Sequence, residues 1–410
     1  MSWTTTHHRI ALTVVDQGVS SLTTLGALVL LAHRTDASGF GALAIGLSVV
    51  VIATGVARSL GTDALAVHHS DPTAPGWHDA AASAMGSALL VGLIAGAMSI
   101  LVGVVAAETL GGVLLVIGAF LPVVCLADGW RGVALAGRRP EAAIAVDGIW
   151  AVTFCLAAWW TTGSTLSPAL LVVVWGCGAW FAAGLGVAIF RLAPSLWSAV
   201  AWLRRHGALA RRCLTEFVLV AGSSQLVLWS IAVSRGFTEA GAMRAAALVL
   251  GLAGVVANGI IAAVVPESAR HQEAARQLSR QLAFAAAGMM LVWAMLVWAV
   301  PASVGSAVLE GRWAEARPIF LPLALLNAGL ILAIVSAGGL RALGRSDQSV
   351  RLLGALTFAS VVAGVAVSPL GAVASCLAMA VPVWVGAFVS LRTLQSASPR
   401  RPFILSNGAS

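Results

Sequence analysis

The tripeptide Phe120-Leu121-Pro122 recurs as Phe320-Leu321-Pro322, a separation of 320 − 120 = 200 residues in a chain of 410. Asp16 has its counterpart in Glu216 at the same offset. Each match is short, and the evidence lies in the common order and nearly constant offset of several matches. A chain that repeats itself at about half its length, in an almost continuously apolar sequence, is typical of a membrane protein with two related halves.

The composition supports a membrane location. Hydrophobic residues make up 59% of the chain and charged residues only 10%, which is too few charges to keep a domain of this size dissolved. The net charge of +8 would suit a nucleic-acid partner, but the basic residues stand at the ends of apolar segments and form no continuous patch. We therefore expect no nucleic-acid binding.

Twelve apolar segments reach the length of about 20 residues that a helix needs to cross a bilayer. They lie near residues 12–32, 39–60, 81–105, 112–131, 142–162, 168–190, 213–234, 240–264, 282–307, 317–340, 350–368 and 370–391. The sequence thus predicts an all-α polytopic membrane protein with two six-helix repeats. The predicted division is an N-terminal lobe over 1–190, an interfacial linker over 191–212, a C-terminal lobe over 213–395 and a tail over 396–410.

The linker and the arginines predict how the chain sits in the membrane. The segment 191–212 carries Trp197, Trp202, Arg204 and Arg205, which favours an amphipathic stretch on the membrane surface; a plain polar linker is the alternative. All 24 basic residues are arginine. Nineteen fall on the side of the N-terminus and five on the other, 19 + 5 = 24, so the positive-inside rule predicts that both termini are cytoplasmic.

Several motifs in this sequence occur together in one known superfamily. The first apolar segment contains Asp16-Gln17-Gly18, and Arg34-Thr35 is followed by Phe40-Gly41. Gly137-Arg138-Arg139 and Gly344-Arg345 follow the fourth and tenth segments, and Gly311-Arg312-Trp313 precedes the tenth. The pattern resembles the multidrug/oligosaccharidyl-lipid/polysaccharide exporter superfamily, and within it the polysaccharide-biosynthesis and O-antigen flippase branch.

The resemblance implies that the first, second, seventh and eighth helices line a central cleft. Polar residues follow one face of the first segment from Asp16, and one face of the seventh from Glu216. Two such stripes could form a hydrated path for a sugar headgroup. The serines and threonines in them could equally bond to backbone carbonyls at helix contacts.

Four arginines are candidates for binding an anionic headgroup, since guanidinium presents a fork that matches phosphate. Arg244 lies in the outer part of the eighth segment, where its repeat counterpart is Ala44. Arg58 lies at the inner end of the second segment, and Arg34 and Arg235 could form the outer rim of the cleft. The alternatives are a side chain reaching to the interface for Arg244, a positive-inside anchor for Arg58, and solvated charges for the other two.

Two carboxamides complete the predicted substrate-binding set. Gln225 and Asn258 lie inside the seventh and eighth segments and could bind sugar hydroxyls or join helices. Asp128, Arg131 and Asp147 have a different interpretation, as a structural latch between the inner ends of the fourth and fifth segments. Asp128 could pair with Arg131 at i and i+3, and Asp147 could pair with Arg131 or Arg138.

Pro122 and Pro322 predict matched kinks within two helices, and Pro266 predicts the end of the eighth. The segment from His68 to His78 predicts a solvated loop, because its histidines and aspartates have no metal-ligand spacing.

The sequence predicts a transporter and no enzyme. The chain has no lysine for a P-loop, and we expect no cofactor and no metal. The leading hypothesis is a flippase-like transporter of a lipid-linked oligosaccharide or related glycolipid in the cell membrane. Its partners would be membrane lipids, the lipid-linked glycan and envelope glycosyltransferases or a polymerase. The alternatives are a proton- or sodium-coupled drug or metabolite antiporter, and a non-transporting scaffold in an envelope-polysaccharide complex.

Overall fold

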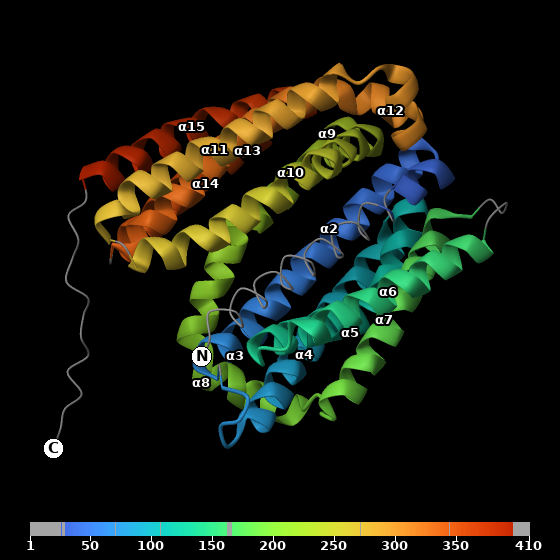
Figure 1. Cartoon of the computed structure of the whole chain (residues 1–410). Coiled ribbons are helices and arrows are strands. Elements are labelled where there is room, and N and C mark those ends of the chain that lie inside the picture. The colour runs from blue at the N-terminus through green and yellow to red at the C-terminus, as the bar shows by residue number, and fades with distance from the viewer. Residues whose placement is uncertain are drawn as a thin grey trace. The chain divides into compact units, whose positions relative to one another are not determined.

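The computed structural model describes residues 26, 29–69, 71–106, 108–161, 166–270, 272–343 and 345–396 (Figure 1). Side chains are not described at 220, 255–270, 272–276, 278, 341–342 and 346. Every regular element within the described ranges is a helix, which confirms the all-α prediction.

The helices follow one another with short connections. In the first part of the chain they are α2 (Ala37–Leu60), α3 (Thr62–His68), α4 (Trp77–Val105), α5 (Glu108–Ala136), α6 (Pro140–Trp160), α7 (Pro168–Phe190), α8 (Leu196–Phe217), a π-helix (Val218–Gly222) and α9 (Ser223–Arg235). The remainder are α10 (Phe237–Arg270), α11 (Gln272–Ala299), α12 (Ala302–Leu309), α13 (Arg312–Ala342), α14 (Ser346–Val367), a 3₁₀ turn (Ser368–Leu370) and α15 (Ala372–Ser396).

Nine of the described helices are long and apolar enough to cross a membrane. They coincide with the predicted segments two to six and nine to twelve, although their ends differ by a few residues. The seventh and eighth predicted segments fall on α8 to α10, and the first lies almost entirely outside the described residues. The division into two six-helix repeats stays a prediction.

Two proline effects differ from expectation. The predicted ninth span, 282–307, is not one helix, because α11 ends at Ala299 and α12 begins after Pro301. Proline lacks a backbone N–H and restricts the residue before it, which explains the break. Pro266 was expected to end the eighth span, but α10 continues to Arg270. Pro122 and Pro322 do lie within α5 and α13.

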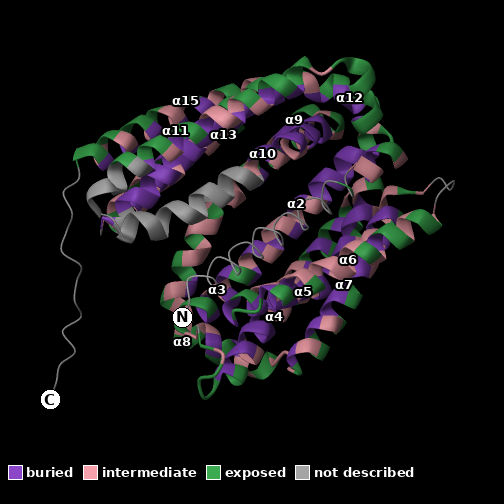
Figure 2. Cartoon of the chain, viewed as in Figure 1, coloured by how far each residue is buried: buried purple, intermediate pink, exposed green. Residues whose placement is uncertain are grey.

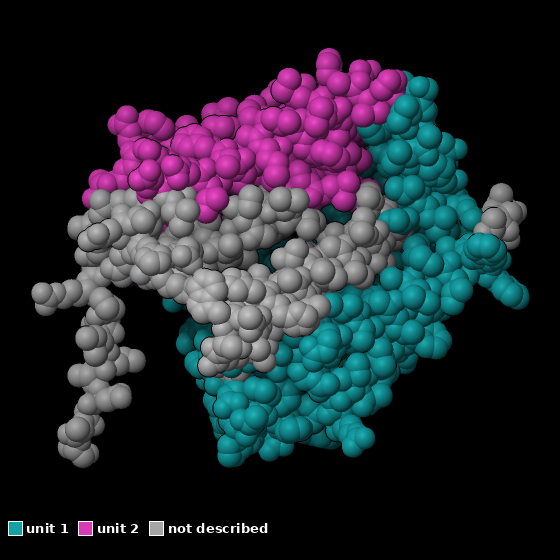
Figure 3. Space-filling model, in the orientation of Figure 1, with its two compact units in different colours: residues 1–245, 302–315 teal, residues 246–301, 316–410 magenta. Residues whose placement is uncertain are grey.

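The chain forms two compact units (Figure 3). Unit 1 comprises residues 1–245 and 302–315, and unit 2 comprises 246–301 and 316–410. The helices α10 and α13 each begin in unit 1 and continue in unit 2. The predicted lobes, 1–190 and 213–395, stay a prediction.

Helix α5 is central to unit 1, where it packs against α2, α4, α6 and α7, and buried positions follow α2 and α5 (Figure 2). The contact with α4 depends on glycine. A Cβ atom at Gly96 would lie 2.5 Å from the carbonyl oxygen of Gly118, so only glycine permits this backbone approach. Deeper in the unit, Trp130 stacks on Phe190 with ring centroids 5.5 Å apart.

Candidate functional site

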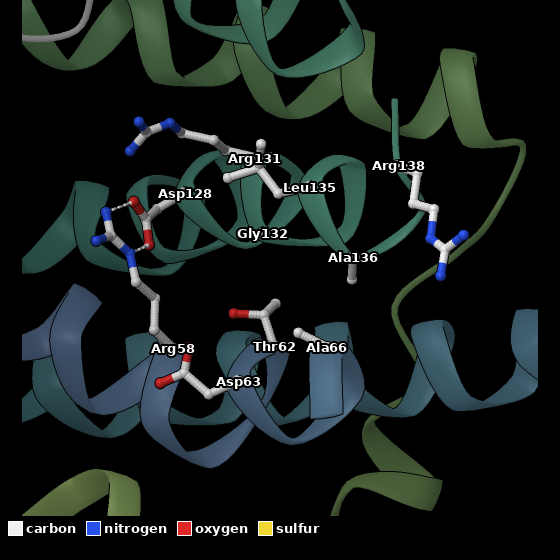
Figure 4. Close-up of a pocket in the computed structure, with 10 residues that line it drawn as sticks. All are labelled: Arg58, Thr62, Asp63, Ala66, Asp128, Arg131, Gly132, Leu135, Ala136 and Arg138. Atoms are coloured by element: carbon white, nitrogen blue, oxygen red, sulfur yellow. Dashed lines mark hydrogen bonds and ion pairs between the residues drawn. The ribbon is translucent and has the colours of Figure 1, made fainter. Parts of the chain in front are cut away.

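A charged cavity of about 500 Å³ opens in unit 1, at the end where α2 finishes and α4 begins (Figure 4). The arginine bias predicts that this end is cytoplasmic. Helices α2, α3 and α5 and the turn after α5 supply the walls. The polar lining consists of Arg58, Thr62, Asp63, Asp128, Arg131 and Arg138.

Arg58 and Asp128 form a two-pronged ion pair across the cavity (Figure 4). The Arg58 Nε donates to Asp128 Oδ2 at 2.6 Å, and Nη2 donates to Oδ1. Arg58 stands in the last turn of α2, where the helix dipole favours a cation. The Asp128 side chain is only 12% exposed, against 46% for Arg58. Asp128 therefore holds the guanidinium in place while part of Arg58 stays open to a ligand.

Arg131 is held in the same way by a residue of the next helix. Its Nε lies 3.3 Å from Asp147 Oδ2, and both side chains are 13% exposed. Of the two partners expected for Asp147, Arg131 or Arg138, the structure shows Arg131, and this pair joins α5 to α6. The third member of the expected latch, Asp128, instead binds Arg58, because α2 packs against the same end of α5.

Asp63 and Arg138 carry the remaining charges of the cavity. Asp63, on α3, is half-buried and interacts electrostatically with Arg58, Asp128 and Glu216. Arg138 follows Gly137 in the turn after α5 and has φ +57°. Arg138 lies at the opposite end of the cavity lining from Arg58 (Figure 4). The lining therefore holds three arginines and two aspartates, 3 − 2 = +1.

The structure places some predicted substrate-binding residues near this cavity and others elsewhere. Arg58 lines it, and Glu216, at the end of α8, acts electrostatically on Asp63. Arg34 instead donates to the carbonyl oxygen of Thr161 at 2.7 Å. Arg235 forms an exposed pair with Glu239 at 3.0 Å. Asp16 lies outside the described residues.

The remaining predicted residues are on α9 and α10. Arg244 is half-buried, and its Nε is inaccessible and has no hydrogen-bond partner. Gln225 is 7% exposed; its Nε2 donates to the Ser224 hydroxyl at 3.0 Å, whereas its Oε1 has no partner. The side chain of Asn258 is not described. Arg244 and Gln225 therefore keep buried polar atoms that a ligand could satisfy.

Arg312 has a role that the sequence analysis missed. Counted among the five arginines on the side opposite the N-terminus, it is 5% exposed and donates from Nη1 and Nη2 to the carbonyl oxygens of Ala32 and Thr35. Its guanidinium carbon lies 5.1 Å from the Phe40 ring centroid. Arg312 thus ties the start of α13 to the segment before α2. Its place in the Gly311-Arg312-Trp313 motif was the available signal.

Two of the histidines expected in a solvated loop, His68 and His69, lie against α8. The ring centroid of His206 is 5.1 Å from that of His68, 5.8 Å from that of His69 and 4.1 Å from that of Trp202. Burial, with the nearby charges of His68 and Arg205, lowers the pKa of both His69 and His206. Within the described part of the chain, no group of three potential ligands is arranged to hold a metal ion.

Comparison with known proteins identifies the fold. No family model and no curated protein sequence matches this chain. Among solved structures, the lipid II flippase MurJ in an inward closed conformation superposes with a TM-score of 0.70 at 12% identity, over 94% of this chain and 88% of that one.

Transporters of the multidrug resistance MATE family also match. An inward-facing member of the MOP superfamily gives a TM-score of 0.69 at 11% identity, over 95% of this chain and 99% of that one. An outward-facing structure gives 0.56 at 13% identity, over 95% and 97%. The chain therefore has the fold of the multi-pass membrane transporters of the MOP superfamily, as the sequence resemblance implied.

Proposed function

We propose that this protein is a transporter that moves a phosphate-bearing, lipid-linked glycan across the cell membrane by alternating access. The observation that carries the proposal is the cavity with three arginines in unit 1. Arg58 of α2, Arg131 of α5 and Arg138 of the following turn line a space of about 500 Å³, which is a typical volume for a small-molecule site.

The pairing of the arginines suits a phosphate ligand. Arg58 and Arg131 are oriented by Asp128 and Asp147, so little side-chain entropy is lost when an anion binds. Arg138 has no ion pair within the described ranges and is exposed, so its donors are available. The lipid tail of such a substrate would stay in the bilayer, while the cavity takes the headgroup.

The structural neighbours support transport and leave two substrate classes to distinguish. One is described as a lipid II flippase and others as multidrug transporters. The cation-lined cavity favours the anionic lipid-linked headgroup. A flippase of this kind would act between the glycosyltransferases that build the glycan and a polymerase that extends it.

The test is a flipping assay on Arg138, with its neighbour as the control. The purified chain is reconstituted in liposomes with a fluorescent polyprenyl pyrophosphate-linked disaccharide, and chemical quenching reports which leaflet holds the label. Loss of one charge-assisted hydrogen bond predicts that Arg138→Gln slows flipping roughly tenfold or more. Arg139→Gln removes the same charge from a residue that pairs with Glu141 at 3.7 Å and does not line the cavity, so it should match the wild type.

Each other result has a defined meaning. If Arg138→Gln flips the lipid as fast as the wild type, the cavity is not the headgroup site. If the wild type flips no labelled lipid but expels a drug in response to a proton or sodium gradient, the protein is an antiporter. If it does neither, it is a scaffold, and the proposal is wrong.

A further inference from the structure

Helix α8 has two opposite faces, and only one of them packs against the protein. Ala199, Trp202, His206 and Ala210 recur at helical spacing and are buried or half-buried. The opposite face is exposed along its whole length. Its members are Trp197, Val200, Ala201, Arg204, Arg205, Ala208, Arg211, Arg212 and Thr215.

The packed face places α8 at the boundary of the membrane. The backbone N–H of Ser195 donates to the carbonyl oxygen of Ala82 at 2.9 Å, and Ser83 donates to Ser198 at 2.9 Å. Ala82 and Ser83 lie in the second turn of α4, a candidate span. At Trp202, Nε1 donates to the carbonyl oxygen of Leu60, the last residue of α2. Helix α8 therefore contacts the start of α4 and the end of α2, which the arginine bias predicts to lie on the cytoplasmic side.

The exposed face changes character along its length. At the end beside α4, Trp197 is 98% exposed and Val200 47%. The following turns present Arg204, Arg205 and then, two turns later, Arg211 and Arg212. No aspartate or glutamate occurs between 192 and 215, so nothing on the helix neutralises these charges before Glu216.

We propose that the exposed face of α8 binds the headgroups of anionic phospholipids in the leaflet on this side of the membrane. An exposed tryptophan at the level of a span's first turns is the residue type that settles at the lipid interface. Four guanidinium groups on the same face match the phosphates and net negative charge of that surface. Trp197 supplies the apolar anchor, and the arginines select the charge of the headgroup.

The experiment measures lipid retained on the full-length protein. Delipidated protein in detergent is mixed with equal amounts of phosphatidylglycerol and phosphatidylcholine, and native mass spectrometry counts the bound molecules of each. We expect the wild type to retain phosphatidylglycerol preferentially. Each arginine near such a surface contributes a few-fold in affinity, so Arg204→Gln with Arg211→Gln should weaken phosphatidylglycerol binding roughly 30-fold and leave phosphatidylcholine unchanged.

Two further variants separate the contributions. Arg280→Gln with Arg351→Gln removes the same charge from exposed residues of α11 and α14 and should change neither lipid. Trp197→Ser should reduce both lipids, because it removes the apolar anchor. The proposal is overturned if the wild type shows no preference, or if both arginine pairs cause the same loss. Neither result depends on whether the protein flips a glycolipid.

Discussion

Among the arginines of this chain, the hydrogen-bond partners of the guanidinium groups differ. Arg312 satisfies two buried carbonyl groups, and Arg58 and Arg131 are held by carboxylates. Arg244 differs, because its buried Nε has no hydrogen-bond partner. A buried guanidinium nitrogen that has no partner has lost hydration without compensation, which is typical of a residue kept for binding.

This imbalance at Arg244 predicts opposite effects on stability and transport. Arg244→Met keeps much of the side-chain volume and removes the desolvated charge, so we expect it to raise stability by about 1 kcal/mol while reducing glycolipid flipping. Thermal melting in detergent and the liposome assay measure the two. Arg235→Met is the control, because that exposed charge already pairs with Glu239. A lower melting temperature for Arg244→Met would show that the guanidinium stabilises the fold.

At the scale of elements, close helix contact explains why α4 and α5 carry glycines. Gly96→Ala would place a methyl group against the Gly118 carbonyl oxygen, and we expect a loss of about 2 kcal/mol. Gly184, on α7, has nothing within 4 Å of a Cβ atom, so Gly184→Ala should stabilise its helix by up to about 1 kcal/mol. The melting temperatures of the two variants should therefore shift in opposite directions. Equal shifts would contradict the close approach of α4 and α5.

The contact between α3 and α8 should depend on pH. Burial lowers the pKa of His69 and His206 in the folded protein, so the unfolded chain takes up these protons first as the pH falls. The stability of the folded state therefore decreases as the pH falls below the ordinary histidine pKa, and it is retained at higher pH. Hydrogen exchange of α8 amides, corrected for intrinsic rates, should accelerate between about pH 7 and 5.

The matched variants for this prediction each replace one histidine with asparagine. His206→Asn removes one of the titrating groups and should flatten the pH dependence of exchange in α8. His78→Asn should leave it unchanged, because His78 contacts Trp77 rather than α8. If His206→Asn retains the full dependence on pH, another group destabilises the contact.

Sequence periodicity and length identified the elements well but not their interruptions. The ends of α2, α4, α5, α6 and α7 were predicted to within a few residues, because a membrane span depends on local hydrophobicity and length. The prediction of one continuous span over residues 282–307 was wrong, because it followed the hydrophobicity of the segment and gave too little weight to Pro301. The π-helix at Val218–Gly222 has no signal in composition, since it depends on how the neighbouring helices pack.

At the scale of the whole molecule, the distribution of arginines predicts its orientation. Nineteen arginines against five predict cytoplasmic termini and an outer location for the turn at Gly236. Alkaline phosphatase, which is active only outside the cytoplasm, should be inactive when fused after Ser410 and active when inserted at Gly236. The reverse pattern would place the end of unit 1 where the cavity opens outside the cytoplasm, contrary to the prediction from the arginines.

The sequence by itself determined the class of this protein: an all-α, multi-pass membrane protein whose motifs resemble the superfamily whose fold it has. Hydrophobicity, span length and the sites of glycine and proline are local properties, so they can be read along the chain. Only the tertiary structure decided the partners of the charges. Arg58 and Asp128 are 128 − 58 = 70 residues apart, and Arg312 reaches carbonyl groups nearly 280 residues earlier. These pairings depend on the rotation and packing of whole helices, which no local pattern of residues specifies.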